Sequence, residues 1–459
     1  MVRIFRHYIP KALLLLGMIE AFILLSAIYF GPALRYGPDW GAAPAPLSVL
    51  PRAVLFLLVM FLIMTAFGLY QREPQEGMWG YFPRLGVSFV VGTAVMSALL
   101  YVLPGIDIGR EALVTSVFLA LAGTAAVRLC YIKIGTHIKV RRRVLVLGCG
   151  SRAGKVDALE KQGWPSFRVV GHLALDEVSQ VGDMRVLSDQ GSLAHIVKKY
   201  AVQTIVVGTR DRRGSVPMRE ILQCKLAGIE VLELPAFLER ETGRIELDTI
   251  CPSWLVFSDG FRQGRARRVL KRSFDLLISV AVLALASPAM LLTALLVAME
   301  DGRPIFYRQE RVGQNGNKFW LYKFRSMRRD AEGDGVPKWA QKDDDRATRF
   351  GRVIRKLRLD ELPQIWNVLR GDMSFVGPRP ERPFFVSQLE ERVAYYGYRH
   401  ALKPGITGWA QVRYCYGASV EDAIQKLQYD FYYIKNNTLF LDMVVMAQTL
   451  QVLLWGKGR

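Results

Sequence analysis

Four long apolar segments occupy the first third of the chain and restrict its fold more than any other feature of the sequence. They cover residues 12–30, 53–70, 85–103 and 112–132. Each approaches the roughly 20 residues that an α-helix needs to cross about 30 Å of hydrocarbon. Because the membrane interior leaves backbone groups without water, such segments span as helices. We therefore predict a bundle of four transmembrane helices over residues 1–140.

Basic residues at both ends of this bundle predict its orientation. Three of them precede the first apolar segment, and a second group follows the fourth: Arg3, Arg6 and Lys11, then Lys133, Lys139, Arg141, Arg142 and Arg143. Lys and Arg are enriched in loops on the cytoplasmic side. Both ends of the bundle, and the domains that follow it, are therefore expected in the cytoplasm.

One acidic residue interrupts the first apolar segment. Glu20 lies within it, where an ionised carboxylate is costly. It marks either a functional carboxylate inside the membrane or a structural residue, in a helix-helix contact or a polar-facing turn, and the structural interpretation is favoured.

The overall composition excludes two classes of protein. The chain has 459 residues, is 51% hydrophobic, and carries 61 Lys and Arg against 41 Asp and Glu. Disordered chains have low hydrophobicity, so disorder is excluded. A net charge of +20 beside this apolar content favours a membrane protein with segregated charge over a soluble nucleic-acid binder. The five cysteines are scattered without a CxxC pair, which indicates no disulfide framework.

Residues 141–262 have the alternating pattern of an α/β domain. Short β-branched segments read "VLVLG", "FRVVGHL", "QTIVVGT" and "GIEVLEL", and helical stretches near 192–200 and 217–227 separate the later ones. This alternation predicts a doubly wound parallel sheet, Rossmann-like or similar to CoA-binding domains.

A glycine-rich turn follows the first of these strands. Gly148 and Gly150 have the spacing of a dinucleotide-binding turn, in which the backbone approaches a pyrophosphate. An acidic residue should follow about 20 residues later, but His172 lies near that place and Asp176 comes late. The favoured interpretation is a fold that keeps the tight turn without a cofactor; a nucleotide site is the alternative.

A fifth apolar segment, over about 274–299, opens the third domain, which covers residues 263–459. Basic residues flank it on both sides, so a simple span would contradict the cytoplasmic rule on one of them. Pro288 removes a backbone hydrogen bond, and Ser287 can bond a freed carbonyl. We predict a re-entrant helix-break-helix that returns to the same face; an ordinary kinked span is the alternative.

Two basic residues follow a predicted hairpin in this domain. "PIFYRQERVGQNGNKFWLYKFRSM" predicts two strands around a turn at Asn315-Gly316. Lys323 and Arg325 lie two residues apart and so share one strand face. Two such cations suit a diphosphate, although a solvated strand has the same pattern.

A row of arginines leads to a pair of carboxylates. Arg352, Arg355 and Arg358 are three residues apart, which predicts one helical stripe that faces lipid headgroups, phosphates or water. Asp360 and Glu361 come next, at the predicted start of a helix that ends at Gly371. Acids at a helix start often serve as caps. Here the surrounding cations indicate a phosphate site, in which Mg²⁺ bound by Asp360 would supply counter-charge.

Two further arginines are candidate phosphate ligands. Arg379 lies between Pro378 and Pro380, which pre-organise its guanidinium for bidentate contact. Arg413 follows the turn-rich stretch "KPGITGWAQV". The last apolar stretch contains Asp442 and two glutamines, so we predict a helix that lies in the membrane interface.

Taken together, "KFRSM", "LDELPQIWNVLRGDMSFVGPRPE" and "KPGITGWAQV" make the chain from about Arg265 onward resemble the bacterial sugar transferase family, the monotopic phosphoglycosyl transferases. The preceding bundle and α/β domain resemble the large, multi-domain branch that starts exopolysaccharide or O-antigen assembly. The resemblance implies a mixed α/β catalytic domain in the bacterial inner membrane. It also implies that sugar-1-phosphate passes from a UDP-sugar to undecaprenyl phosphate, with release of UMP.

The resemblance further implies a ping-pong reaction and assigns residues to it. Asp360 would form a covalent sugar-phosphate intermediate, assisted by Glu361. Lys323, Arg355 and Arg379 match family cations near phosphate, and Ser287-Pro288 match the break of the re-entrant helix. "GWAQV" continues here with Arg-Tyr-Cys rather than Asn-Gly-Arg, and Arg413 is the candidate for the replaced cation. Anionic lipid and a second copy of the chain are expected partners, and nucleic acid is not.

Two other functions fit parts of the sequence. A membrane-bound, NAD-dependent nucleotide-sugar epimerase or dehydratase shares the bundle and the glycine-rich turn, but the chain has no Tyr-xxx-Lys pair for proton transfer. A non-enzymatic scaffold would use the basic surface to bind anionic lipid. A scaffold function does not explain the Asp360-Glu361 pair.

Overall fold

The computed structural model describes residues 2–4, 6–36, 46–70, 77–102, 110–137, 141–162, 166–175, 185–187, 191–209, 216–261, 264–328, 331, 345–414, 417 and 419–455. Asp176 lies outside these residues. The chain divides into two compact units, Arg128–Ser258 and Val2–Val127 with Asp259–Arg459.

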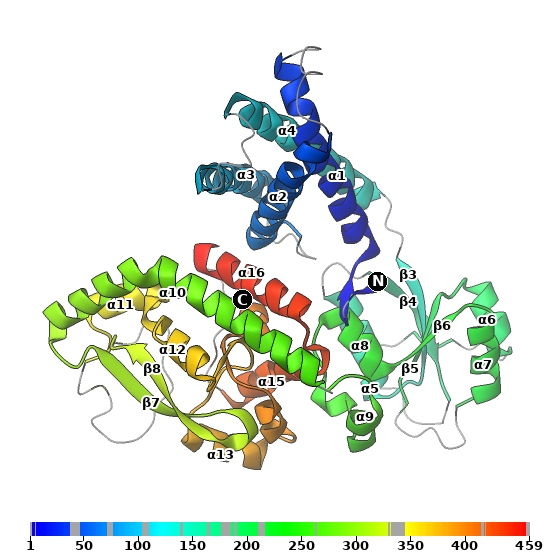
Figure 1. Cartoon of the computed structure of the whole chain (residues 1–459). Helices are drawn as coiled ribbons and strands as arrows, with labels where there is room; N and C mark the ends of the chain where they lie inside the picture. The colour runs from blue at the N-terminus through cyan, green and yellow to red at the C-terminus, as the bar shows by residue number, and fades with distance from the viewer. Residues whose placement is uncertain are drawn as a thin grey trace. The chain divides into compact units, whose positions relative to one another are not determined.

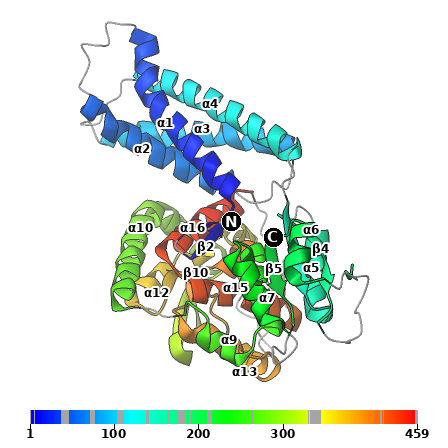
Figure 2. The same cartoon turned by 90° about the vertical axis from the view of Figure 1, so that its right-hand side faces the viewer.

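Four apolar helices form the N-terminal bundle: α1 (Lys11–Tyr36), α2 (Pro46–Ala66), α3 (Gly77–Val102) and α4 (Arg110–His137). A short antiparallel pair, β1 (Val2–Ile4) and β2 (His7–Ile9), precedes them (Figures 1 and 2). All four predicted helices are therefore present. Each contains a segment of 18 to 24 residues that is long and apolar enough to cross a membrane.

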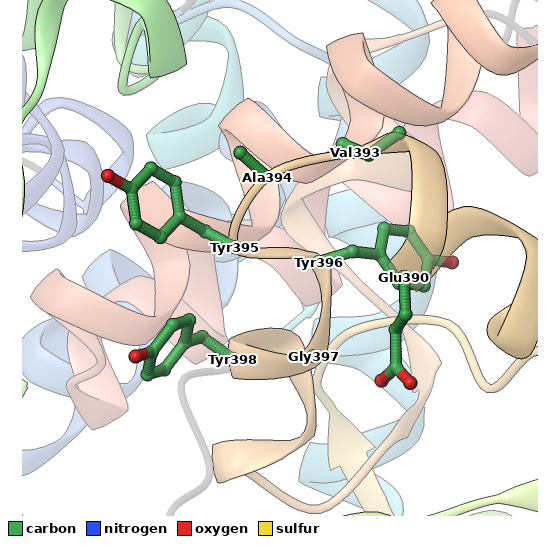
Figure 3. Close-up of a pocket in the computed structure, with 7 residues that line it drawn as sticks. All are labelled: Glu390, Val393, Ala394, Tyr395, Tyr396, Gly397 and Tyr398. Carbon is green, nitrogen blue, oxygen red and sulfur yellow. The ribbon is translucent and has the colours of Figure 1, made fainter.

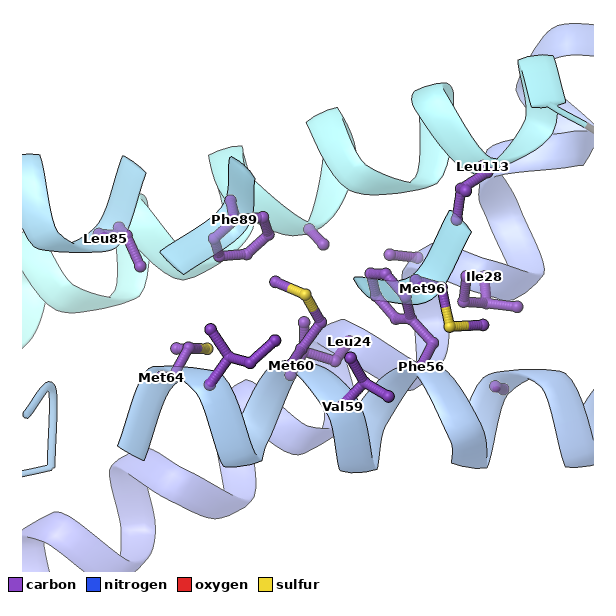
Figure 4. Packing of buried hydrophobic residues seen from close by; sticks show 14 of the residues in the cluster. Leu24, Ile28, Phe56, Val59, Met60, Met64, Leu85, Phe89, Met96 and Leu113 are labelled. Atoms are coloured by element: carbon purple, nitrogen blue, oxygen red, sulfur yellow. The ribbon is translucent and has the colours of Figure 1, made fainter. Parts of the chain in front are cut away.

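Leu, Phe and Met side chains fill the centre of this bundle. Leu24 of α1, Phe56 and Met60 of α2, and Met96 of α3 are fully buried in one cluster (Figure 4). Many other apolar side chains of these helices point outward, such as Phe22, which is 71% exposed. Exposed apolar surface around a packed centre is what lipid would cover.

Glu20 is buried within the same bundle. The hydroxyl of Tyr70 donates a hydrogen bond to its carboxylate at 2.5 Å. Tyr70 lies in the turn after α2, so Glu20 joins α1 to that turn. This agrees with the favoured interpretation of Glu20 as a structural residue.

The unit over Arg128–Ser258 contains the predicted parallel sheet. Its strands are β3 (Arg142–Leu147), β4 (Phe167–Leu173), β5 (Thr204–Val207) and β6 (Glu230–Glu233), hydrogen-bonded in the order β4-β3-β5-β6. All three pairings are parallel. The helices are α5 (Ser151–Lys161), α6 (Leu193–Lys199), α7 (Met218–Leu226), α8 (Leu234–Thr242) and α9 (Pro252–Phe257).

Helices cover both faces of this sheet because its central strand is apolar on both sides. Val144 and Val146 pack with residues of α5 and α8, whereas Leu145 and Leu147 pack with residues of α6 and α7. Continuous apolar strands of this kind are typical of buried parallel sheets. The predicted α/β arrangement of this region is confirmed (Figure 1).

The C-terminal region begins with α10 (Arg265–Asp301), a helix of 37 residues. Figure 1 shows α10 as one unbroken helix, and Ser287 and Pro288 lie inside it. The Ser287 hydroxyl donates to the carbonyl of Ala284 at 2.9 Å. The helix therefore does not end at the predicted break. Return of the chain to the same membrane face stays a prediction.

The rest of this region is a mixed α/β assembly. An antiparallel hairpin, β7 (Phe306–Val312) and β8 (Lys318–Phe324), turns at Asn315-Gly316 as predicted. The parallel pair β9 (Ser374–Val376) and β10 (Gly405–Thr407) lies further along the chain. The remaining helices are α11 (Arg349–Lys356), α12 (Gln364–Arg370), α13 (Pro383–Arg392), α14 (Trp409–Arg413), α15 (Val420–Asn436) and α16 (Leu439–Trp455). The last of these is the predicted C-terminal helix, and its place in the interface stays a prediction.

Candidate active site

The carboxylate pair lies on one tight turn between two helices. Asp360 and Glu361 belong to the 3₁₀ turn Leu359–Glu361, which follows α11 and precedes α12. Both residues are only 8% exposed. Pro363 directly precedes α12, and Gly371 ends it in the left-handed conformation (φ 96°), as the sequence predicted.

The predicted arginine stripe is wrong at its last member. α11 ends at Lys356, and Arg358 adopts the left-handed conformation (φ 57°) at the start of the 3₁₀ turn. The helical three-residue spacing therefore stops before Arg358. This break in the helix turns the Arg358 side chain toward Glu361, with the guanidinium 3.4 Å from the carboxylate.

Glu361 is the centre of a cluster of cations. Its Oε1 accepts a hydrogen bond from the Arg379 guanidinium at 2.9 Å and lies 3.3 Å from the Lys323 ammonium. With Arg358, three positive side chains share one carboxylate oxygen. Burial by itself would raise the pKa of Glu361, but Arg379, Lys323 and Arg358 together lower it well below its usual range. Glu361 is therefore ionised.

Asp360 differs from its neighbour: among the described residues, no cation is bonded to it. Its Oδ1 is buried and has no hydrogen-bond partner in the described part of the chain. Burial, and then the like charge of Glu361, raise the pKa of Asp360 against the opposing fields of Lys323, Arg358 and Arg355. Two adjacent carboxylates with opposite pKa shifts suit different roles in one reaction. The Oδ1 of Asp360 lies near several cations and has no hydrogen-bond partner among the described residues, so it is available for nucleophilic attack.

Lys323 reaches the pair from the hairpin. It lies on β8, and burial lowers its pKa although Glu361 raises it. The hairpin is held to α12 by Asn367, which is fully buried. The Asn367 side chain donates to the carbonyl of Trp320 at 2.7 Å and accepts from the amide of Tyr322 at 3.1 Å. This amide bridge fixes Lys323 against the carboxylate turn.

Arg325 lies elsewhere, contrary to the prediction that it shares a face with Lys323. Strand β8 ends at Phe324, and the Arg325 guanidinium donates to the carbonyls of Asp301 and Gly302 at 2.8 and 2.6 Å. It also pairs with the Asp301 carboxylate at 3.2 Å. The last carbonyls of a helix carry partial negative charge and attract a cation. Arg325 therefore caps α10, and a role in phosphate binding stays a prediction.

The two remaining candidate arginines lie in different helices. Arg355 lies in the last turn of α11, where it acts on Asp360 through its charge and keeps a buried Nη1 without a hydrogen bond in the described residues. Arg413 ends α14 with its guanidinium 4.4 Å from the centre of the Trp409 ring.

The glycine-rich turn has lost its expected acidic residue. Gly148 has a φ of 113°, and Gly150 directly precedes α5. The buried ring of His172, the penultimate residue of β4, lies near the place expected for the acid: its Nδ1 is 3.1 Å from the Gly148 carbonyl, and its Nε2 is 2.7 Å from the Asp157 carboxylate. A nucleotide-binding role for this turn stays a prediction.

The sequence interpretation missed residues that complete the site. Arg358 was assigned to the stripe, and nothing singled out Asn367 or Arg399. Asn367 bonds Trp320 and Tyr322, and Arg399 bonds Arg379 and Asp430; these partners are distant in sequence, so no local spacing marks the two residues. The "NVLRGD" segment did contain the one signal available, an asparagine among apolar residues on a predicted helix.

The residues present fit a metal only in part. No cluster of three or more His, Cys, Asp and Glu side chains occurs among the described residues. Mg²⁺ is commonly held by one or two carboxylates together with substrate phosphates. The unpartnered Oδ1 of Asp360 is a suitable oxygen for such a site.

A family comparison matches this region of the chain. The model for the family described as bacterial sugar transferase covers residues 266–456, which include the carboxylate turn, the hairpin and Arg379. The chain belongs to this family, whose members include polyprenyl-phosphate hexose-1-phosphate transferases.

Several relatives extend the similarity beyond this region. Undecaprenyl-phosphate galactose phosphotransferase of Salmonella typhimurium is 39% identical over 338 residues, 69% of each chain. UDP-N-acetylgalactosamine-undecaprenyl-phosphate N-acetylgalactosaminephosphotransferase of Aeromonas hydrophila is 43% identical over 240 residues, 52% of this chain and 56% of that protein. UDP-glucose:undecaprenyl-phosphate glucose-1-phosphate transferase of Xanthomonas campestris is 33% identical over 325 residues, 67% of this chain and 66% of that protein. These comparisons do not support the alternative of an epimerase or dehydratase.

Proposed function

We propose that the protein transfers a sugar-1-phosphate from a UDP-sugar to undecaprenyl phosphate and releases UMP. The observation that carries this proposal is the buried Asp360-Glu361 pair, with its cations and the unpartnered oxygen of Asp360. The names of the relatives support the substrates, since each transfers a sugar phosphate to undecaprenyl phosphate. These names differ in the sugar, so the hexose is left to experiment.

The first step of the proposed reaction forms a covalent intermediate. An ionised oxygen of Asp360 attacks the β-phosphorus of the UDP-sugar, a new P–O bond forms, and the bond to the UMP oxygen breaks. UMP leaves with that electron pair, and the sugar phosphate stays on Asp360 as an acyl phosphate. Carboxylate nucleophiles divide one difficult transfer into two easier steps.

The second step regenerates the enzyme. A phosphate oxygen of undecaprenyl phosphate attacks the phosphorus held on Asp360, the acyl phosphate bond breaks, and the carboxylate returns. The product is a lipid diphosphate that carries the sugar. Because the intermediate forms only as the bond to UMP breaks, UMP is released before undecaprenyl phosphate reacts.

The cations of the site neutralise the charge that moves in both steps. Arg379 and Lys323 already bind one carboxylate oxygen, so their positive groups point to the place where phosphate oxygens would lie. Arg355 has a buried donor without a partner in the described residues, which suits a phosphate contact. In phosphoryl transfer the protein mainly positions the groups and balances charge.

Mg²⁺ fits this scheme as an expected cofactor. Asp360 would hold it together with substrate phosphates, and the ion would neutralise charge on the diphosphate. Glu361 is then left to orient the nucleophile or handle a proton, because its own charge is already balanced by three cations.

The proposed location is the cytoplasmic face of the bacterial inner membrane. In this proposal α1 to α4 span the bilayer, and α10 enters it and returns through a kink at Ser287-Pro288. The apolar side chains of α10 support insertion, since Leu285 and Leu291 are 83% and 72% exposed. Anionic lipid would complement the basic flanks.

The test is UMP release by the full chain with Mg²⁺ and undecaprenyl phosphate. The donors are UDP-glucose, UDP-galactose and UDP-N-acetylgalactosamine, each with a radiolabelled sugar. We expect one donor to release UMP and to leave label on the denatured protein before lipid is added. Asp360→Asn should abolish both signals, and Asp345→Asn, at an exposed site, should keep them. Full turnover by Asp360→Asn would refute the mechanism, and no release from any donor would refute the proposed substrates.

A further inference from the structure

The backbone that carries Arg379 is held by one buried side chain. Arg399 is 7% exposed and lies in the 3₁₀ segment Tyr396–Ala401. Its guanidinium donates to the backbone carbonyl of Arg379 at 3.1 Å. On its other side, Arg379 donates to Glu361 at 2.9 Å. Arg399 therefore contacts the same residue whose side chain reaches the carboxylate pair.

Arg399 is itself fixed by two buried partners. The same guanidinium nitrogen that contacts Arg379 donates to the Asp430 carboxylate at 2.8 Å, and the other terminal nitrogen donates to the Tyr396 hydroxyl at 2.5 Å. Asp430 is 1% exposed and Tyr396 is 2% exposed. A planar guanidinium with several donors can bond three acceptors in fixed directions, which a lysine cannot do.

Helix α15 also contacts the segment that leads to Arg379, at Val376. Tyr433 lies one turn after Asp430, and its hydroxyl donates to the carbonyl of Val376 at 2.9 Å. Residues three apart lie on one face of a helix. One face of α15 thus holds both Val376, directly through Tyr433, and Arg379, through Arg399.

The tyrosines at positions 395, 396 and 398 point to two different sides of the chain. Tyr395 and Tyr398 point to one side of the chain and Tyr396 to the other (Figure 3). All three tyrosines line a pocket of about 370 Å³, but Tyr398 is 62% exposed and Tyr396 only 2%. Tyr396 is bonded to Arg399 and Tyr398 is exposed, so Tyr396 and Tyr398 form a matched pair for experiment.

We infer that Arg399, braced by Asp430 and Tyr396, is a positioning residue that sets the Arg379 guanidinium at the carboxylate pair. It acts through the backbone of Arg379 and touches no substrate. This inference rests on the proposed function, in which Arg379 neutralises phosphate charge. It adds an element that the local sequence does not mark, because Asp430 follows Arg399 by 31 residues.

A double-mutant cycle tests this coupling. Arg399→Lys and Arg379→Lys are made singly and together in the full chain, and kcat and KM for the active UDP-sugar are measured. If Arg399 acts through Arg379, Arg399→Lys lowers kcat/KM about tenfold or more in the wild type. In the Arg379→Lys background it lowers kcat/KM less than about threefold. A merely structural residue would give the same loss in both backgrounds, since independent effects add.

Milder variants guard against misfolding. Tyr396→Phe removes one acceptor of Arg399 and keeps the ring, and it should lower kcat/KM several-fold. Tyr398→Phe, on the outer side, should leave kcat/KM unchanged. Amide exchange of residues 374–382 gives a readout that needs no activity, and Arg399→Lys should speed it at least tenfold. Equal losses in both backgrounds, or unchanged exchange, would overturn the inference; an inactive wild type would instead refute the proposed function.

Discussion

Replacing Asn367 by leucine tests whether the bridge between α12 and β8 holds the site together. Leucine has a similar shape but no polar atoms, so the carbonyl of Trp320 and the amide of Tyr322 both lose their partner. Asn367 is fully buried, and water does not reach these groups easily. An unsatisfied buried polar group costs about 1–3 kcal/mol, so two cost about 2–6 kcal/mol.

Hydrogen exchange of peptides from β8 measures this loss directly. A fall of 2 kcal/mol in the free energy of local opening corresponds to about 30-fold faster exchange, because about 1.4 kcal/mol is tenfold. We expect at least this acceleration in peptides that contain Tyr322, together with lower transfer activity. The control is Arg370→Gln, at an exposed position whose ion pair with Asp372 is 3.9 Å long. Exchange within about threefold of wild type in Asn367→Leu would refute the reasoning.

Two further predictions concern the unit over Arg128–Ser258. Burial lowers the pKa of His172, but its contacts with Asp157 and with the Gly148 carbonyl together raise it more, so the net shift is upward. Amide protection of β4 should therefore be highest below about pH 6.5 and fall as the pH rises through the folded-state pKa. His172→Gln should remove this pH dependence, and a pH-independent wild type would contradict the prediction. Gly148→Ala should lower stability by about 1–3 kcal/mol, because φ is 113° and the new Cβ would lie 3.0 Å from Thr209. Gly150→Ala meets no atom within 4 Å, so an equal drop in thermal midpoint for both variants would refute this explanation.

Elements that depend on local sequence pattern were predictable. The apolar segments became α1 to α4, and "FRVVGHL" is β4 residue for residue. The hairpin turns at Asn315-Gly316 because both residues adopt a positive φ there, which Asn and Gly tolerate best. In each case a few neighbouring residues decide the conformation, and no distant contact has to be known.

The side-chain arrangement of the site was predictable only in part. The cations near Asp360 and Glu361 were expected, and Lys323 and Arg379 do contact Glu361. The strand face expected for Arg325 was wrong, because its guanidinium bonds a carbonyl at the end of α10, 24 residues earlier in the sequence.

Arg358 was misassigned for a different reason. Its left-handed backbone ends the helix at a residue with ordinary helix propensity, and no glycine or proline marks the place. Contacts between distant segments decide such a position, and a single sequence does not show them.

The triple pairing of Glu361 has a consequence for selectivity. An incoming anion must compete with a carboxylate that already holds Arg379, Lys323 and Arg358. A ligand with one weak negative charge offers these cations no more than Glu361 does. A group with several adjacent charged oxygens attracts these three cations more strongly than Glu361 does. We therefore expect the charge density of a ligand, and not only its shape, to decide whether it binds.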